Sequence, residues 1–119
     1  RKPFALAYRE LMRSLDRSDR WLIVGYSFRD ACVNQQLTDA LARKATPPEV
    51  LVVTYGRDPE HRTVVDAFGW SEWDDGPADW LTINRDGANA MVDSDDWKRF
   101  SRQQGTWKLA SCCNGVGAP

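Results

Sequence analysis

The sequence contains few of the side chains that build metal centres and disulfide frameworks. Among its 119 residues are one histidine and three cysteines. The cysteines, Cys32, Cys112 and Cys113, are odd in number, show neither C-x-x-C nor Cys/His spacing, and include an adjacent pair, which rarely forms a bridge. We therefore predict no disulfide framework and no metal site, and a reducing cytoplasm as the compartment.

An excess of charge and a long apolar run are also absent. The chain carries 16 basic and 17 acidic residues, so it has no basic field to attract nucleic acid or an anionic membrane surface. No apolar stretch approaches the roughly 20 residues of a spanning helix or has a signal-peptide layout. We expect neither nucleic acid nor a membrane as a partner. The chain begins with Arg1 rather than methionine, from which we expect a fragment.

The residues that are present favour one small α/β domain or part of one. Residues 21–24 and 50–53 are continuous apolar runs, typical of strands that are covered on both faces. Between them, apolar residues recur at helical spacing from Val33 to Leu41. Strand, loop, helix and strand predict a right-handed crossover unit in a Rossmann-like open parallel sheet with flanking helices. A truncated sheet of this kind would expose an edge, so we predict an incomplete domain that self-associates or pairs with its missing half.

Weaker patterns predict further elements. Apolar spacing indicates a helix over residues 3–16, and Asp58 and Pro59 resemble the cap and first position of a helix that Gly69 ends. Residues 80–84 are typical of a short third strand, and residues 94–104 of a helix.

Two segments lack a pattern of regular structure. We predict a surface loop with aromatic anchors over residues 70–76. Trp70, Trp73 and Trp80 are expected to serve as core anchors or as a domain-contact patch. Residues 1–110 are expected to form the α/β domain, and residues 111–119 a flexible tail.

The loop at residues 25–30 is the first candidate site, because parallel sheets bind ligands beyond the carboxyl ends of their strands. Gly25 allows close backbone approach or merely makes a turn, and Ser27 offers a hydroxyl and an N–H group to phosphate or ribose. Arg29 can pair with phosphate, with Asp30 or with a neighbouring carboxylate, and Asp30 suits a helix cap better than a ligand contact.

Residues 21–30, read as WLIVGYSFRD and followed by Val33, Asn34 and Leu37, resemble the C-terminal motif of the bacterial sirtuin-like domain family. The resemblance extends over about residues 3–56. It implies a Rossmann-type domain that binds NAD and, in active members, hydrolyses the nicotinamide–ribose bond, often in defence against phage. Protein deacylation belongs to the related sirtuins.

The resemblance also implies a set of cofactor-binding residues. Gly25 and Ser27 are similar to the glycine and serine of the sirtuin Gly-Thr-Ser loop, with Tyr26 in place of threonine, and Asn34 matches an asparagine that either meets the cofactor or holds the loop on its helix. Sirtuins place an asparagine after the second strand, where this chain has Thr54 and Tyr55, which can hydrogen-bond a ribose and pack on a base. The full predicted set is Gly25, Tyr26, Ser27, Phe28, Arg29, Asp30, Asn34, Thr54 and Tyr55.

Catalytic residues are not assigned. A family member would use a Gly-rich phosphate loop and an Asn/Asp-plus-His pair, which nothing before Phe4 supplies, and His61 is typical of a surface histidine near a helix start. The sequence therefore predicts an NAD-binding part that is inactive alone and is completed by a missing N-terminal half or a partner chain. The alternatives are a noncatalytic nucleotide-sensing or interaction module, and an unrelated doubly wound domain in which Ser27 lies far from any pocket.

Overall fold

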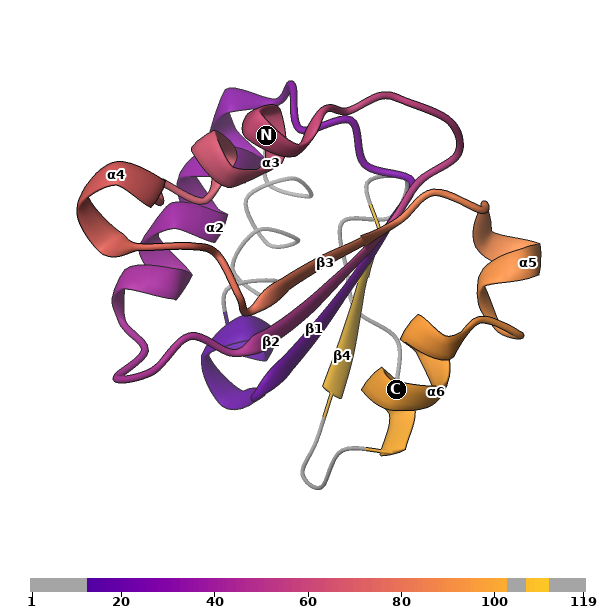
Figure 1. The fold of residues 1–119 in the computed structure, drawn as a ribbon. Coiled ribbons are helices and arrows are strands. Elements are labelled where there is room, and N and C mark those ends of the chain that lie inside the picture. Colours follow the sequence, from indigo (N-terminus) through magenta and orange to yellow (C-terminus); the bar gives the residue numbers. More distant parts are fainter. Residues whose placement is uncertain (1–12, 103–106, 112–119) are drawn as a thin grey trace, which may run out of the picture.

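The structure, a computed structural model, describes residues 13–102 and 107–111. Within these residues, four parallel strands form one sheet in the order β3-β2-β1-β4 (Figure 1). The strands are β1 (Arg20–Val24), β2 (Glu49–Val53), β3 (Leu81–Asn84) and β4 (Trp107–Ser111). The helices are α2 (Ala31–Ala42), α3 (His61–Ala67), α4 (Glu72–Asp75), α5 (Ala88–Met91) and α6 (Asp95–Arg102), and residues 13–17 are also helical.

The strand order confirms the predicted Rossmann-like α/β class. The chain steps outward from β1 to β2 and β3, and then returns to place β4 on the opposite side of β1. The order of strands therefore reverses beside β1, as it does at the ligand crevice of doubly wound sheets.

The two faces of the sheet carry cores of unequal size. Figure 1 shows α2, α3 and α4 on one side of the sheet and α5 and α6 on the other. Trp21 and Ile23 of β1 join the larger core on the α2 and α3 side, whereas Leu22 joins the smaller one with Met91 and Phe100. Burial on both faces explains why the strands read as continuous apolar runs.

Aromatic rings concentrate in the larger core. The Phe68 ring centroid lies 6.2 Å from that of Trp21 and 5.3 Å from that of Trp80. Trp70 is half-buried and meets Trp80 edge to face at 5.4 Å. These two tryptophans are core anchors, as predicted, but Trp73 is 94% exposed.

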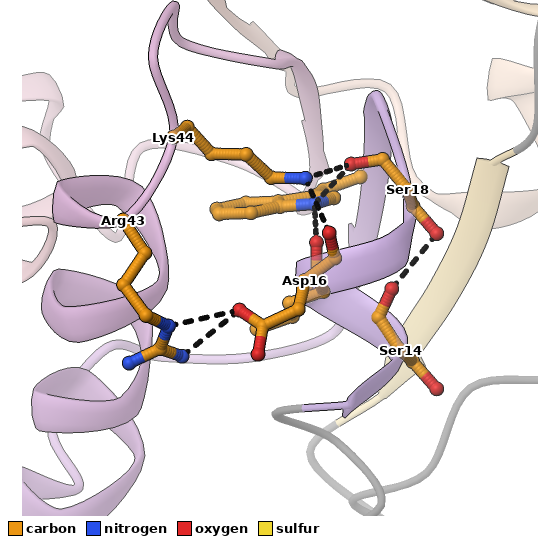
Figure 2. Close-up of polar contacts among 7 residues, drawn as sticks. Ser14, Asp16, Ser18, Arg43 and Lys44 are labelled. Atoms are coloured by element: carbon orange, nitrogen blue, oxygen red, sulfur yellow. Dashed lines mark hydrogen bonds and ion pairs between the residues drawn. The ribbon is translucent and has the colours of Figure 1, made fainter.

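At the amino end of β1, a set of polar contacts joins residues 14–18 to the end of α2 (Figure 2). The Lys44 ammonium donates to the carbonyl oxygens of Asp16 and Ser18, each at 2.8 Å, and Arg43 pairs with the Asp16 carboxylate at 3.0 Å. The buried Trp21 indole N–H also donates to the Ser18 carbonyl, at 3.3 Å. The last carbonyl groups of a helix have no N–H donors within the helix itself. These contacts supply donors to the carbonyl groups at the end of the 13–17 helix and just after it.

Several predicted elements are confirmed. The strands at residues 21–24, 50–53 and 80–84 correspond to β1, β2 and β3, and the helix between the first two corresponds to α2. The helix predicted over residues 94–104 is α6, whose first turn is capped by the Ser94 hydroxyl, which accepts from the Trp97 N–H at 3.2 Å. Residues 103–104 lie outside the described residues, as does the helix predicted over residues 3–16 up to residue 12.

The predicted start of α3 was wrong. The helix begins at His61 with Glu60 as its N-cap, and Pro59 is buried ahead of it instead of occupying the first turn. The reason is a return of the chain toward β2, where the Thr54 hydroxyl donates to the Asp58 carbonyl at 2.7 Å.

Three elements were not predicted. Residues 70–76 contain the single turn α4, in which the Ser71 hydroxyl accepts from the Asp74 N–H and the Asp75 carboxylate accepts from the Ser71 N–H. The short helix α5 and the strand β4 were also missed. Ser111 ends β4, and residues 112–119 of the predicted tail lie outside the described residues. Among the described residues, no helix has the length and apolar character needed to cross a membrane.

Candidate functional site

The loop after β1 has an unusual backbone. Gly25 has φ 73°, which glycine adopts without steric cost, and Phe28 has φ 64°, which an aromatic residue adopts at a cost of about 1–2 kcal/mol. Burial offsets this cost, because Phe28 is only 3% exposed and its ring lies 4.6 Å from the Tyr26 ring. The strained position turns the backbone so that Ser27 and Arg29 are exposed on either side of a buried ring.

The side chain of Asn34 holds this loop against α2. Its amide donates to the Phe28 carbonyl at 3.0 Å, and its oxygen accepts from the Tyr26 hydroxyl at 2.7 Å. The Tyr26 hydroxyl also lies 3.0 Å from the Asp30 carbonyl. The structural role considered for Asn34 is therefore confirmed, and it makes the conformation of the loop depend on α2.

Asp30 is the N-cap of α2. Its carboxylate accepts from the N–H groups of Cys32 at 2.9 Å and Val33 at 3.1 Å. Capping satisfies two of the helix's four orphan donors, as the sequence led us to expect.

The segment after β2 faces the loop. Thr54 uses its hydroxyl hydrogen internally, in the bond to the Asp58 carbonyl, so it retains only acceptor capacity. Tyr55 is 84% exposed, and its ring lies beside Gly87, where an added Cβ would come within 3.2 Å of the ring. Tyr55 thus presents an open aromatic face at the edge of the sheet.

A cavity of about 420 Å³ lies between these two segments, beyond the carboxyl ends of β1 and β2. Its volume falls within the range of about 300–1,000 Å³ that is usual for small-ligand sites. The lining residues are Gly25, Tyr26, Ser27, Arg29, Thr54, Tyr55, Asp58, Pro59, Glu60 and Thr63.

The charges around the cavity are mixed. Arg29 supplies one guanidinium group, and Asp58 and Glu60 supply two carboxylates. None of these three side chains makes a hydrogen bond or ion pair within the residues that the structure describes, and all three are exposed. Charged groups held at a concave surface without internal partners are available to a ligand that has both anionic and hydroxyl groups.

The structure brings most of the predicted site residues together. Six of the nine predicted cofactor-binding residues line the cavity: Gly25, Tyr26, Ser27, Arg29, Thr54 and Tyr55. The other three, Phe28, Asp30 and Asn34, lie outside its lining and shape the loop from behind. An unrelated domain with an accidental loop match was expected to leave Ser27 far from any pocket. Ser27 instead lines the cavity, which does not agree with that alternative.

Four lining residues were missed by the sequence reasoning, namely Asp58, Pro59, Glu60 and Thr63. The sequence pattern predicts only a helix start at Asp58 and Pro59. The available signal was their position shortly after a buried strand, because the carboxyl ends of neighbouring parallel strands meet at one edge of the sheet.

Two reactive side chains lie outside the cavity lining. His61 is the exposed first residue of α3, and its Nε2 atom lies 3.4 Å from the Glu72 carboxylate. Cys32 is exposed in the first turn of α2. Across residues 13–102 and 107–111, no three histidine, cysteine, aspartate or glutamate side chains gather into a group that could hold a metal ion.

Comparison with known proteins identifies the segment that builds the cavity. The family model described as the SIR2-like domain matches residues 3–71, which is more than half of the chain. The matched segment contains β1, α2, β2 and α3 and every residue that lines the cavity. Searches of the curated proteins and of the solved structures found no match. The chain belongs to the family of SIR2-like domains.

Proposed function

We propose that this chain binds NAD in the cavity beyond β1 and β2. The observation that carries the proposal is the convergence of the Gly25 loop and residues 54–60 on one cavity, within the segment that matches the SIR2-like family. Members of this family generally bind NAD. The position at the carboxyl edge of a parallel sheet, next to the reversal of strand order, is the usual place for a dinucleotide.

The chemistry of the lining fits the parts of NAD. The Ser27 hydroxyl and the Arg29 guanidinium suit the pyrophosphate, since both donate hydrogen bonds and one is cationic. The carboxylates of Asp58 and Glu60 suit ribose hydroxyls, which donate to them. Tyr55 offers a ring on which a base can stack. Bound NAD would bring a nicotinamide–ribose bond that is open to cleavage, and these residues would bind and orient the molecule.

We further propose that the complete site hydrolyses NAD and that its general base comes from another segment or chain. The cavity lining within the described residues includes no histidine, and His61 instead faces Glu72. In the complete protein, NAD depletion would suit a role in defence against phage. The competing function is a noncatalytic nucleotide sensor, which uses the same cavity without turnover.

Calorimetric titration of the full chain with NAD and with ADP-ribose tests the binding proposal. We expect saturable binding of both, weakened about five- to tenfold by Ser27→Ala, because one hydrogen bond to a charged phosphate is lost. Ser101→Ala, an exposed serine on α6, is the matched control and should bind as the wild type does. A folded chain that binds neither ligand would refute the proposal. Release of nicotinamide over time, measured on the complete protein together with the segment or chain that supplies the general base, separates hydrolysis from sensing.

A further inference from the structure

The surface formed by α3 and α4 contains an aromatic site that the NAD proposal does not use. A second cavity, of about 200 Å³, is lined by Arg62, Val65, Asp66, Trp70, Ser71, Glu72 and Trp73. We call these seven residues the α3–α4 cavity. Its volume suits one long side chain rather than a nucleotide. The match to the SIR2-like family ends at residue 71, so it assigns nothing to Trp73 or to the rest of α4.

Two tryptophans at this cavity differ in exposure. Trp70 is half-buried and fixed, since its indole N–H donates to the Gly76 carbonyl at 2.8 Å and its ring packs on Trp80. Trp73, in contrast, is 94% exposed. An indole ring this exposed contributes little to the core, and beside a cavity it offers a face to a partner.

The backbone that carries Trp73 is ordered by its own hydrogen bonds. The Asp74 N–H donates to the Ser71 hydroxyl at 3.2 Å, and the Ser71 N–H donates to the Asp75 carboxylate at 3.1 Å. The Asp75 N–H also donates to the Ser71 carbonyl at 2.7 Å. A turn that is already formed loses little entropy when a partner binds its side chain.

The charge of this surface selects the kind of partner. Residues 63–84 contain five acidic residues and no lysine, arginine or histidine. Asp74, next to Trp73, is exposed, and its carboxylate makes no bond within the described residues. One cation, Arg62, belongs to the cavity lining; it lies 3.8 Å from the Asp66 carboxylate and its side chain is 88% exposed, so it competes weakly. The His61 ring lies 3.4 Å from the Glu72 carboxylate.

We propose that the α3–α4 cavity docks an arginine-bearing segment of a partner protein. The guanidinium lies over the exposed Trp73 ring, where the π electrons attract a cation, and the neighbouring carboxylates add Coulomb attraction. Arginine fits better than lysine because its planar, weakly hydrated group stacks on an indole ring. The stem of the side chain occupies the cavity between Val65 and Trp70.

Binding of short labelled peptides to the full chain, followed by fluorescence anisotropy, tests this proposal. The probe alternates arginine with glycine, and its matched control replaces each arginine by citrulline, which has nearly the same shape without the charge. We expect the arginine peptide to bind and the citrulline peptide to bind at least about fivefold more weakly. Equal binding of the two peptides, or no binding of the arginine peptide, would refute the proposal.

Variants locate the binding on the surface. Trp73→Ala should weaken the arginine peptide about fivefold, Trp73→Phe should fall between it and the wild type, and Asp74→Asn should weaken binding by a smaller factor. Val92→Ala removes another exposed apolar side chain, after α5, and should leave the affinity for the arginine peptide unchanged.

Because Trp73 is exposed, its removal should leave thermal unfolding unchanged. A Trp73→Ala chain that keeps wild-type affinity would overturn the assignment. NAD titration of the same variant should be unaffected, so failure here is distinct from failure of the NAD proposal.

Discussion

The two ends of the sheet use polar groups in opposite ways. At the amino end of β1, Lys44 donates to two main-chain carbonyls and Arg43 pairs with Asp16, so these charges are satisfied within the protein (Figure 2). At the carboxyl end, the side chains of Arg29 and Glu60 line a cavity and make no hydrogen bond or ion pair within the described residues. The same types of side chain thus stabilise the fold at one end and remain available to a ligand at the other.

The comparison teaches where this domain can tolerate change. Substitutions of Trp21 and Lys44 at the amino end should lower stability, because they remove donors from the carbonyl groups of the buried residues Leu15 and Ser18. Substitutions of exposed residues at the carboxyl end should alter ligand affinity with little effect on stability. The loop between them is the exception, since Asn34 both stabilises the fold and shapes the cavity.

The largest expected effect is at the amino end. Trp21 is fully buried and donates to the Leu15 and Ser18 carbonyls, so Trp21→Ala should lower the free energy of unfolding by about 3–5 kcal/mol. Urea unfolding measures it. Trp73→Ala is the matched control, and its exposed ring should contribute less than about 0.5 kcal/mol. Equal losses in the two variants would contradict the assigned core.

An intermediate effect is expected at Asn34, which contributes both to stability and to the shape of the cavity. Asn34→Ala removes the donor to the Phe28 carbonyl and an acceptor for Tyr26, which should cost about 1–2 kcal/mol of unfolding free energy. The substitution should also weaken the binding of NAD, because fewer hydrogen bonds then stabilise the positive-φ conformation of Phe28 in the loop. Gln35→Ala is the control, since the exposed Gln35 side chain is bonded to the Asp39 side chain and not to the loop within the part of the chain that the structure describes. Wild-type NAD affinity in Asn34→Ala would show that the loop keeps its shape without Asn34.

The smallest effect concerns pH. Burial raises the pKa of the Glu49 carboxyl above its ordinary value of 4.5, although Arg99 opposes the shift. A carboxyl group whose pKa is raised by folding stabilises the protein when protonated, and that contribution is lost as the pH rises through the folded pKa. Glu49→Gln should therefore be slightly more stable than the wild type near pH 7, with no advantage near pH 3. Thermal unfolding across this pH range measures it, and an advantage that grows in acid would contradict the sign.

Much of the fold could be predicted because its signals are local. The apolar runs of β1 and β2 and the spacing between Val33 and Leu41 report burial directly. The cavity was found in part for the same reason, since the Gly25 loop and Thr54 each follow a recognisable strand. Asp58 and Glu60 could not be predicted as lining residues, because they reach the cavity only where the chain turns back toward β2. The hydrogen bond from the Thr54 hydroxyl to the Asp58 carbonyl stabilises that turn.

By itself, the sequence determined the α/β class, the strand–helix–strand unit and the loop that lines the cavity beyond β1. Only the tertiary structure decided that β4 pairs with β1, that Phe28 is a buried support of the loop, and that Trp73 is exposed while Trp80 is buried. The physical reason is the range of the interactions. Periodicity and turn preferences act between near neighbours, whereas strand pairing, burial and cavity walls depend on residues that are distant in the chain.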